Sequence, residues 1–212
     1  MSNRLTREDT LWHQRLWASE ELYTGELDGL WGPKTEEASQ AFDYHTRKLR
    51  KLHGEFDSRT ERNIVSMSLS AQTYARASHR RLMKAGVECK VISGRRTYAH
   101  QAQLYSIGRT TELDRRVVTY ARAGRSMHNF GIAWDYGAFP NGQYDGDTVS
   151  LYQRIGEVLR PYWESDNAPM RWGGQWSNPD WPHFQLALRQ RATIVAQYFE
   201  QGQVFAALNH VA

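Results

Sequence analysis

Cysteine is almost absent from this 212-residue chain, which has only Cys89. A single cysteine excludes an intrachain disulfide and suits folding in a reducing compartment. Cys89 lies in the alternating segment 87–92, so we expect a buried structural thiol, because burial suppresses the reactive thiolate. No run approaches the ~20 apolar residues that a membrane-spanning helix needs, and no apolar signal segment follows Met1. We therefore expect cytoplasmic synthesis and no stable insertion into a membrane.

Several common catalytic signatures are also missing. The sequence contains no His-Glu-x-x-His segment and no cysteine pair, so the two commonest zinc signatures are absent. It also lacks a Gly-x-Ser-x-Gly nucleophile elbow and a phosphate-binding loop. Segment 140–147 offers several oxygen ligands but not the order of an EF-hand, so we expect no calcium site there.

The charge balance is mildly basic. There are 27 Lys and Arg residues against 23 Asp and Glu, which gives a net charge of +4. Such a surface favours polyanions, which include nucleic acid, anionic lipid and acidic wall polymers. No clustered basic helix or reader motif supports nucleic-acid binding, so we expect no nucleic-acid partner.

The composition and periodicity are typical of a globular α+β protein. Hydrophobic residues make up 40% and charged residues 24%. Alternating or apolar segments predict strands, and helical periodicity predicts helices around a small antiparallel sheet. The expected strands cover 87–92, 131–138 and 181–188, the expected helices include 71–85, 98–107, 149–163 and 189–205, and a hairpin turn is expected at 140–142.

A weak internal repeat marks the N-terminal part. Gly25-Glu26-Leu27-Asp28 and Gly54-Glu55-Phe56-Asp57 each place a turn and a capping residue before a helical segment. The repeat indicates a small three-helix module over residues 1–67, followed by a second domain over 68–212. The core of the module is expected to contain the aromatic residues Trp12, Trp17, Trp31 and Phe42.

Two distant segments carry the candidate chemistry. His128 and Asp135 lie in one of them, and Asp180 and His183 lie in the other. Two imidazoles and one carboxylate make a plausible three-ligand zinc set with an open fourth position. A second carboxylate could take a proton from the water there.

These segments resemble a known enzyme family. The string Ser126-x-His128-x-x-Gly131-x-Ala133-x-Asp135, followed by Asp180-x-x-His183, resembles the zinc peptidases that include D-Ala-D-Ala carboxypeptidases and phage L-alanyl-D-glutamate peptidases. Ser93-Gly94-Arg95-Arg96-Thr97 and Trp172-Gly173-Gly174-x-Trp176 are similar to further segments of that family. The resemblance covers about residues 68–188.

The resemblance implies a role for each of these residues. His128, Asp135 and His183 would be the zinc ligands, and Asp180 would be the acid/base carboxylate, where many relatives have glutamate. Arg96 would stabilise the oxyanion, and strand alternation would point Arg95 the opposite way. Ser126 or backbone carbonyls would orient the imidazoles. The remaining histidines are expected to be structural or exposed: His13, His45, His53, His79, His100 and His210.

The N-terminal module has its own resemblance. Leu27-Asp28-Gly29-Leu30-Trp31-Gly32-x-x-Thr35-x-x-Ala38, with Phe42 beyond, resembles the small three-helix peptidoglycan-binding domain over about residues 8–67. Asp43 stands where that domain usually has glutamine.

The two resemblances together imply a phage endolysin whose partner is bacterial peptidoglycan. We expect a monomer that stays in the host cytoplasm until lysis and then reaches the cell wall. The expected reaction is zinc-dependent cleavage of the L-alanyl–D-glutamate bond of the stem peptide. Two alternatives stay open: a D-Ala-D-Ala carboxypeptidase or other stem-peptide peptidase, and a wall-binding protein with a degenerate peptidase domain.

Overall fold

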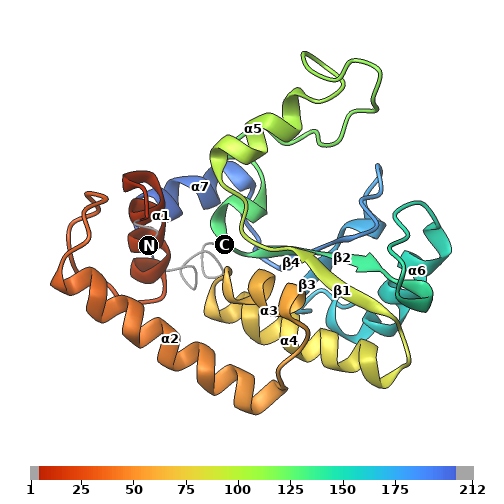
Figure 1. Ribbon diagram of the computed structural model, residues 1–212, viewed down its shortest axis with the longest axis horizontal. Helices are drawn as coiled ribbons and strands as arrows, with labels where there is room; N and C mark the ends of the chain where they lie inside the picture. The colour runs from red at the N-terminus through yellow and green to blue at the C-terminus, as the bar shows by residue number, and fades with distance from the viewer. Residues whose placement is uncertain (1–4, 204–212) are drawn as a thin grey trace. The chain divides into compact units, whose positions relative to one another are not determined.

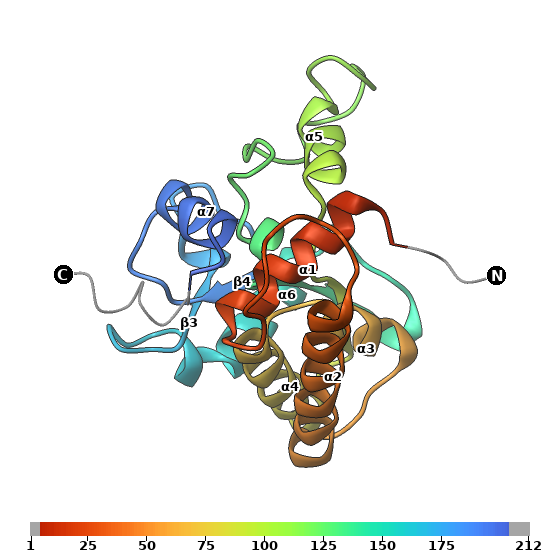
Figure 2. The ribbon, with the colours of Figure 1, turned by 90° about the vertical axis from the view of Figure 1, so that its left-hand side faces the viewer.

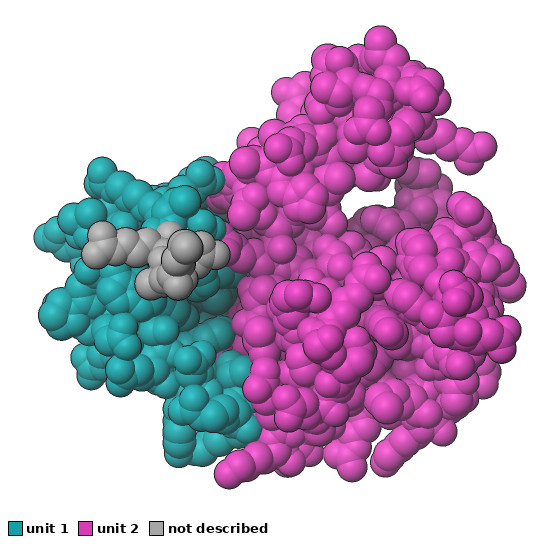
Figure 3. All heavy atoms as spheres, viewed as in Figure 1, with its two compact units in different colours: residues 1–48, 188–212 teal, residues 49–187 magenta. Residues whose placement is uncertain are grey.

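The computed structural model describes residues 5–203. The chain forms two compact units, one of residues 1–48 with 188–212 and one of residues 49–187 (Figure 3). We call them unit 1 and unit 2. Within the described residues, no helix combines the length and the apolar character needed to cross a membrane.

Unit 1 is built from helices. It contains α1 (Arg7–Ser19), most of α2 (Pro33–His53) and α7 (Ala192–Glu200). Thr6 caps α1 by accepting a hydrogen bond from the Asp9 amide, and Pro33 suits the first position of α2 because its missing N–H needs no partner there. The rings of Trp12 and Phe199 lie 5.8 Å apart, which joins α1 to α7.

The aromatic core of this unit is smaller than the sequence predicts. Trp12, Trp17 and Phe42 are buried as expected, but Trp31 is 46% exposed, so its assignment to the core was wrong. The Trp31 Nε1 donates to the carboxylate of Glu36 at 3.0 Å. This polar partner on the surface of α2 keeps the indole edge at the solvent boundary.

A buried amide organises the loop before α2. Gln14 is fully buried, and its Nε2 donates to Asp28 Oδ1 at 3.0 Å while its Oε1 accepts from the Gly29 amide at 2.8 Å. Asp28 also accepts from the Leu30 amide at 2.8 Å. Gly29 has a φ of 72°, a conformation that glycine adopts without steric cost. These contacts give the Asp28-Gly29 pair a structural function.

Unit 2 combines helices with one antiparallel sheet. Its strands are β1 (Cys89–Ser93), β2 (Ala133–Ala138), β3 (Met170–Trp172) and β4 (His183–Leu186), in the order β1-β2-β4-β3. Its helices are α3 (Ser58–Val65), α4 (Leu69–Lys84), α5 (Tyr98–Ser106) and α6 (Val149–Val158). Figures 1 and 2 show α3 and α4 together against the sheet, while α5 and the loop after it stand out from the unit. The predicted α+β class with a small antiparallel sheet is confirmed.

Strand alternation gives the sheet two chemically different faces. Trp134 and Tyr136 of β2 and Phe184 of β4 are fully buried. The Tyr136 hydroxyl lies 2.8 Å from the Ser78 hydroxyl, so this face packs on α4. Because successive strand residues point to opposite faces, Asp135 and His183 project from the other face. The core therefore fixes the strands whose alternate residues carry the candidate site.

Several predicted boundaries shift for local reasons. The helix expected at 149–163 ends at Val158, and a short 3₁₀ turn follows over Arg160–Tyr162, where Pro161 lacks an N–H for the helix. Strand β3 was not predicted because it has only three residues. The turn at 140–142 is present, and an antiparallel bridge joins Ala138 to Asp145 beyond it.

The compact units do not follow the predicted boundary between residues 67 and 68. Unit 2 begins at Leu49, so it includes α3, which packs on β1. The Asn63 Nδ2 donates to the Val91 carbonyl at 2.8 Å, and the Thr60 hydroxyl accepts from the Val91 amide at 3.2 Å. A binding domain over residues 1–67 stays a prediction.

Cys89 is half-buried, which is less than the sequence predicts, but its thiol is unreactive as expected. Burial raises the pKa of this thiol to about 12. The reactive thiolate is therefore scarce near neutral pH, and Cys89 makes a poor nucleophile.

A buried ion pair connects α3 to α4. Arg76 is fully buried and Glu61 nearly so, and the guanidinium donates to both carboxylate oxygens at 2.7 and 2.8 Å. Glu61 also accepts from the Phe56 amide at 3.0 Å. The pKa of Glu61 stays below its ordinary value because Arg76 and these hydrogen bonds outweigh the effect of burial.

We expect Arg76→Met to lower the free energy of unfolding by about 3–5 kcal/mol, because it leaves the Glu61 carboxylate buried without its main partner. Urea unfolding followed by circular dichroism measures the change. Arg80→Met, at an exposed position on the same helix, should change stability by less than ~0.5 kcal/mol. Combining Arg76→Met with Glu61→Gln should restore part of the loss; a double variant as unstable as the sum of both single variants would contradict this account.

Candidate metal centre

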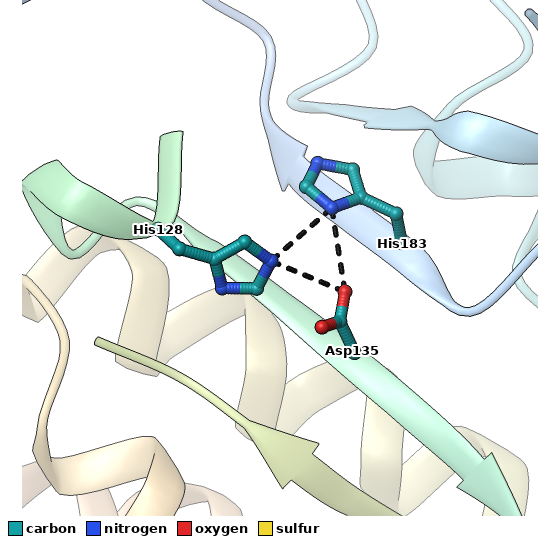
Figure 4. Close-up of side chains that lie close together, drawn as sticks. All are labelled: His128, Asp135 and His183. Carbon is teal, nitrogen blue, oxygen red and sulfur yellow. Dashed lines mark hydrogen bonds and ion pairs between the residues drawn. The ribbon is translucent and has the colours of Figure 1, made fainter. Parts of the chain in front are cut away.

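Three side chains from separate elements converge on one point of the sheet face (Figure 4). His128 comes from a 3₁₀ turn over Met127–Phe130, Asp135 from β2 and His183 from β4. The His128 Nε2 lies 3.1 Å from Asp135 Oδ1 and 3.3 Å from His183 Nδ1, and the last two atoms are 3.3 Å apart. Two nitrogens and one oxygen in such a group fit a divalent cation.

Backbone pairing places two of the three groups. Asp135 and His183 are directly opposite each other in the antiparallel ladder between β2 and β4, and opposite residues project from the same face. His128 reaches them from a turn that ends at Gly131, whose φ of 66° lies in the left-handed region. Glycine therefore allows the chain to turn sharply from His128 into β2.

Hydrogen bonds orient both imidazoles. The Nδ1 of His128 lies 2.7 Å from the Gly94 carbonyl, which can only accept, so Nδ1 carries the proton and Nε2 faces the site. The Nε2 of His183 lies 3.1 Å from the Gln185 amide oxygen, which leaves Nδ1 for the site. A backbone carbonyl was expected in this role, whereas Gln185 was not predicted.

The segment that supplies this carbonyl requires glycine. A Cβ on Gly94 would lie 2.2 Å from the Asn63 carbonyl oxygen, so only glycine lets the backbone pass this close to the end of α3. Asn129 Nδ2 donates to the Arg96 carbonyl at 2.8 Å, and the Arg96 amide donates to the His128 carbonyl at 3.0 Å. These bonds tie the two segments together, and Asn129 is a supporting residue that the sequence did not reveal.

Arg96 lies at the edge of the three-ligand group. Its Nη2 donates to Asp135 Oδ2 at 3.3 Å, and its Nη1 donates to Gln101 Oε1 at 3.0 Å. The backbone amide of the neighbouring Arg95 donates to the Ser66 hydroxyl at 2.9 Å. The guanidinium of Arg96 thus contacts one residue of the candidate site.

The pKa of Asp135 shows how strongly the site favours its charged form. Burial alone would raise this pKa, but the two imidazoles outweigh it and hold the pKa well below its ordinary value. Burial lowers and Asp135 raises the pKa of His183, and the net result is a raised pKa. The carboxylate stays ionised and attracts positive charge, which suits a cation ligand.

Asp180 lies beside the three-ligand group and not within it. Its amide donates to the Gly173 carbonyl at 3.0 Å, and its carbonyl accepts from the His183 amide at 3.2 Å. A Cβ on Gly173 would come within 2.5 Å of the Asp180 carbonyl oxygen, which explains one glycine of the Trp172-Gly173-Gly174 segment. Asp180 is exposed as a whole residue, but neighbouring protein atoms exclude water from its carboxyl group and raise its pKa. The nearby His183 opposes this rise.

Comparison with known proteins gives consistent matches. Residues 119–186 match the protein family described as D-alanyl-D-alanine carboxypeptidase. The peptidoglycan L-alanyl-D-glutamate endopeptidase CwlK of Bacillus subtilis (strain 168) is 30% identical over 111 residues, which are 48% of this chain and 62% of that protein. The chain therefore matches less than two thirds of the length of this relative.

A solved structure also matches. The crystal structure of the Serratia marcescens L-Ala D-Glu endopeptidase ChiX shares 27% identity, with a TM-score of 0.45, over 62% of this chain and 89% of the other. The stretch matched by the family includes all four residues of the sequence motif: His128, Asp135, Asp180 and His183. Residues 119–186 are thus similar to the D-alanyl-D-alanine carboxypeptidase family.

Proposed function

We propose that this chain is a zinc-dependent peptidoglycan hydrolase that cleaves the L-alanyl–D-glutamate bond of the stem peptide. The observation that carries the proposal is the convergence of His128, Asp135 and His183 within 4.8 Å, with Asp180 beside them. The names of the two similar enzymes, both L-Ala–D-Glu endopeptidases, support this choice of bond.

The three-ligand set would hold zinc and leave a position for water or substrate. Zinc in such a site polarises a carbonyl and lets water act as a nucleophile near neutral pH. Asp180 accepts the proton of the attacking water and passes it to the leaving amine; the raised pKa of its carboxyl suits this exchange. Arg96 donates to the developing oxyanion, a contribution typically worth ~3–4 kcal/mol.

His128→Ala should lose both zinc and activity, because it removes one of the three ligands. Metal analysis of the purified protein and a cell-wall turbidity assay measure the two effects. His45→Ala is a matched control, since His45 lies on α2 outside the site. Full zinc content in His128→Ala would show that this residue is not a ligand.

Asp180→Ala should keep zinc but lose about a hundredfold to ten-thousandfold in kcat, the usual range for a general acid/base residue. Zinc content and the rate of wall digestion are measured on the same preparation. Asp166→Ala, at an exposed acidic position in unit 2, should keep both. Cleavage of cell walls by Asp180→Ala at the wild-type rate would refute the assignment.

Mass spectrometry of digested muropeptides identifies the bond. We expect new peptides that begin with D-Glu, and a chelator should prevent their appearance. Release of D-Ala would instead indicate a D-Ala-D-Ala carboxypeptidase. Binding to walls without any cleaved product in the presence of zinc would indicate a wall-binding protein.

In biological terms, we propose that the chain is a phage endolysin. The combination of a peptidase domain with an N-terminal segment that resembles a wall-binding domain supports this proposal. The protein would act as a monomer, remain in the host cytoplasm until lysis and then reach the peptidoglycan. The excess of basic residues would favour its approach to an anionic envelope.

A further inference from the structure

A pocket adjoins the metal centre and takes no part in the chemistry described above. It has a volume of about 240 Å³. Its lining combines aromatic and charged side chains: Trp163, Glu164, Arg171, Trp172, Gln175 and Trp176. Indole walls with a few charged groups are typical of a site for a small polar ligand. We call it the tryptophan pocket.

One wall of the tryptophan pocket touches a metal ligand. The ring of Trp176 lies 5.1 Å from the ring of His183 and is 42% exposed. Trp163 and Trp172 are buried, with their rings 5.2 Å apart. The Trp172 Nε1 donates to the Trp181 carbonyl at 3.0 Å, which fixes this ring. A ligand against the open face of Trp176 would thus lie one side chain away from the metal centre.

Arg171 places a positive charge on the same face of the sheet. In the ladder between β3 and β4 it lies directly opposite Gln185, and opposite residues share a face. The Gln185 side chain contacts His183 on that face. Since strands rise ~3.3 Å per residue, Gln185 follows His183 by about 7 Å. The long Arg171 side chain is therefore positioned to reach a substrate group near the scissile bond.

The positive charge of Arg171 is available to a ligand. The side chain is exposed, and the structure shows no ion pair of Arg171 with any residue from 5 to 203. Glu164, the acidic residue of the pocket, pairs with Arg160 at 3.4 Å. A planar guanidinium beside an aromatic wall suits a carboxylate carried on a short, partly apolar group.

We propose that the tryptophan pocket binds the substrate residue next to the scissile bond, with Arg171 on its free carboxylate and Trp176 against its apolar atoms. This inference rests on the proposed function. When D-Glu continues the stem peptide through its side-chain carboxyl, its α-carboxylate stays free and lies beside the nitrogen of the scissile bond. Arg171 therefore reads the α-carboxylate that D-Glu carries beside the scissile nitrogen, a charge that D-isoglutamine lacks.

The test uses two soluble muramoyl tripeptides that differ only at the second residue, which is D-Glu in one and its α-amide, D-isoglutamine, in the other. The wild-type protein with zinc should cleave the acid with a kcat/KM about 10- to 100-fold higher, as expected for a hydrogen-bonded charge. Arg171→Met should lower kcat/KM for the acid by that factor and leave the amide unchanged. Trp176→Leu should lower kcat/KM for both peptides alike.

Arg154→Met is the matched control, because Arg154 is exposed on α6; it should leave both kcat/KM values unchanged. If Arg171→Met lowers kcat/KM equally for both peptides, or for neither, the inference is overturned while the proposed L-Ala–D-Glu activity stands.

If the wild-type protein cleaves neither peptide, the proposed function fails. A binding measurement then tests the inference about the tryptophan pocket independently. Calorimetric titration of the zinc-supplemented Asp180→Asn variant with each peptide then tests the pocket. Tighter binding of the acid that Arg171→Met abolishes supports the inference, and equal affinities reject it.

Discussion

Two imidazole nitrogens and one carboxylate oxygen meet within hydrogen-bond distance of one another, largely shielded from water. The facing nitrogens of His128 and His183 are 3.3 Å apart, and each ring gives its other nitrogen to an acceptor. Their lone pairs therefore point at each other unless a cation or a proton lies between them. The ionised Asp135 beside them favours positive charge at that point. Much of the surrounding structure keeps these three groups together.

The sheet helps to keep these three groups in place because alternate residues of one strand serve two purposes: one set packs in the core, and the other forms the candidate site. Trp134, Tyr136 and Phe184 fill the face against α4, and the alternate residues Asp135 and His183 place candidate ligands on the opposite face. A shift of one residue in the register of β2 or β4 would turn the candidate ligands toward α4 and the aromatic rings away from it. The core therefore fixes the geometry of the site, and this rigidity is what a preorganised centre needs.

Much of the candidate site could be predicted because its residues lie in two short segments of the sequence. His128 and Asp135 come from one short segment, Asp180 and His183 from another, and each has a recognisable spacing. The supporting contacts were not predictable, since Asn129, Gln185 and the Gly94 carbonyl meet their partners only after folding. The capping position at Asp57 was confirmed because caps depend on neighbouring residues. Strand β3 was too short to show periodicity, and the exposure of Trp31 depends on the polar partner that Glu36 supplies.

The proposed catalytic residues do not by themselves select which peptide bond is cut. A metal ion, an acid/base carboxylate and an oxyanion donor contact the atoms common to all peptide bonds, so they serve a carboxypeptidase as well as an endopeptidase. Selection needs groups that contact what differs between substrates, such as the peptide that continues from the side chain of D-Glu and is missing from a terminal D-Ala. We infer that such groups lie on β3 and on the turn after it, where Arg171 lies opposite Gln185 and Trp176 contacts His183. These are therefore positions where we expect specificity to change without disturbing the candidate metal ligands.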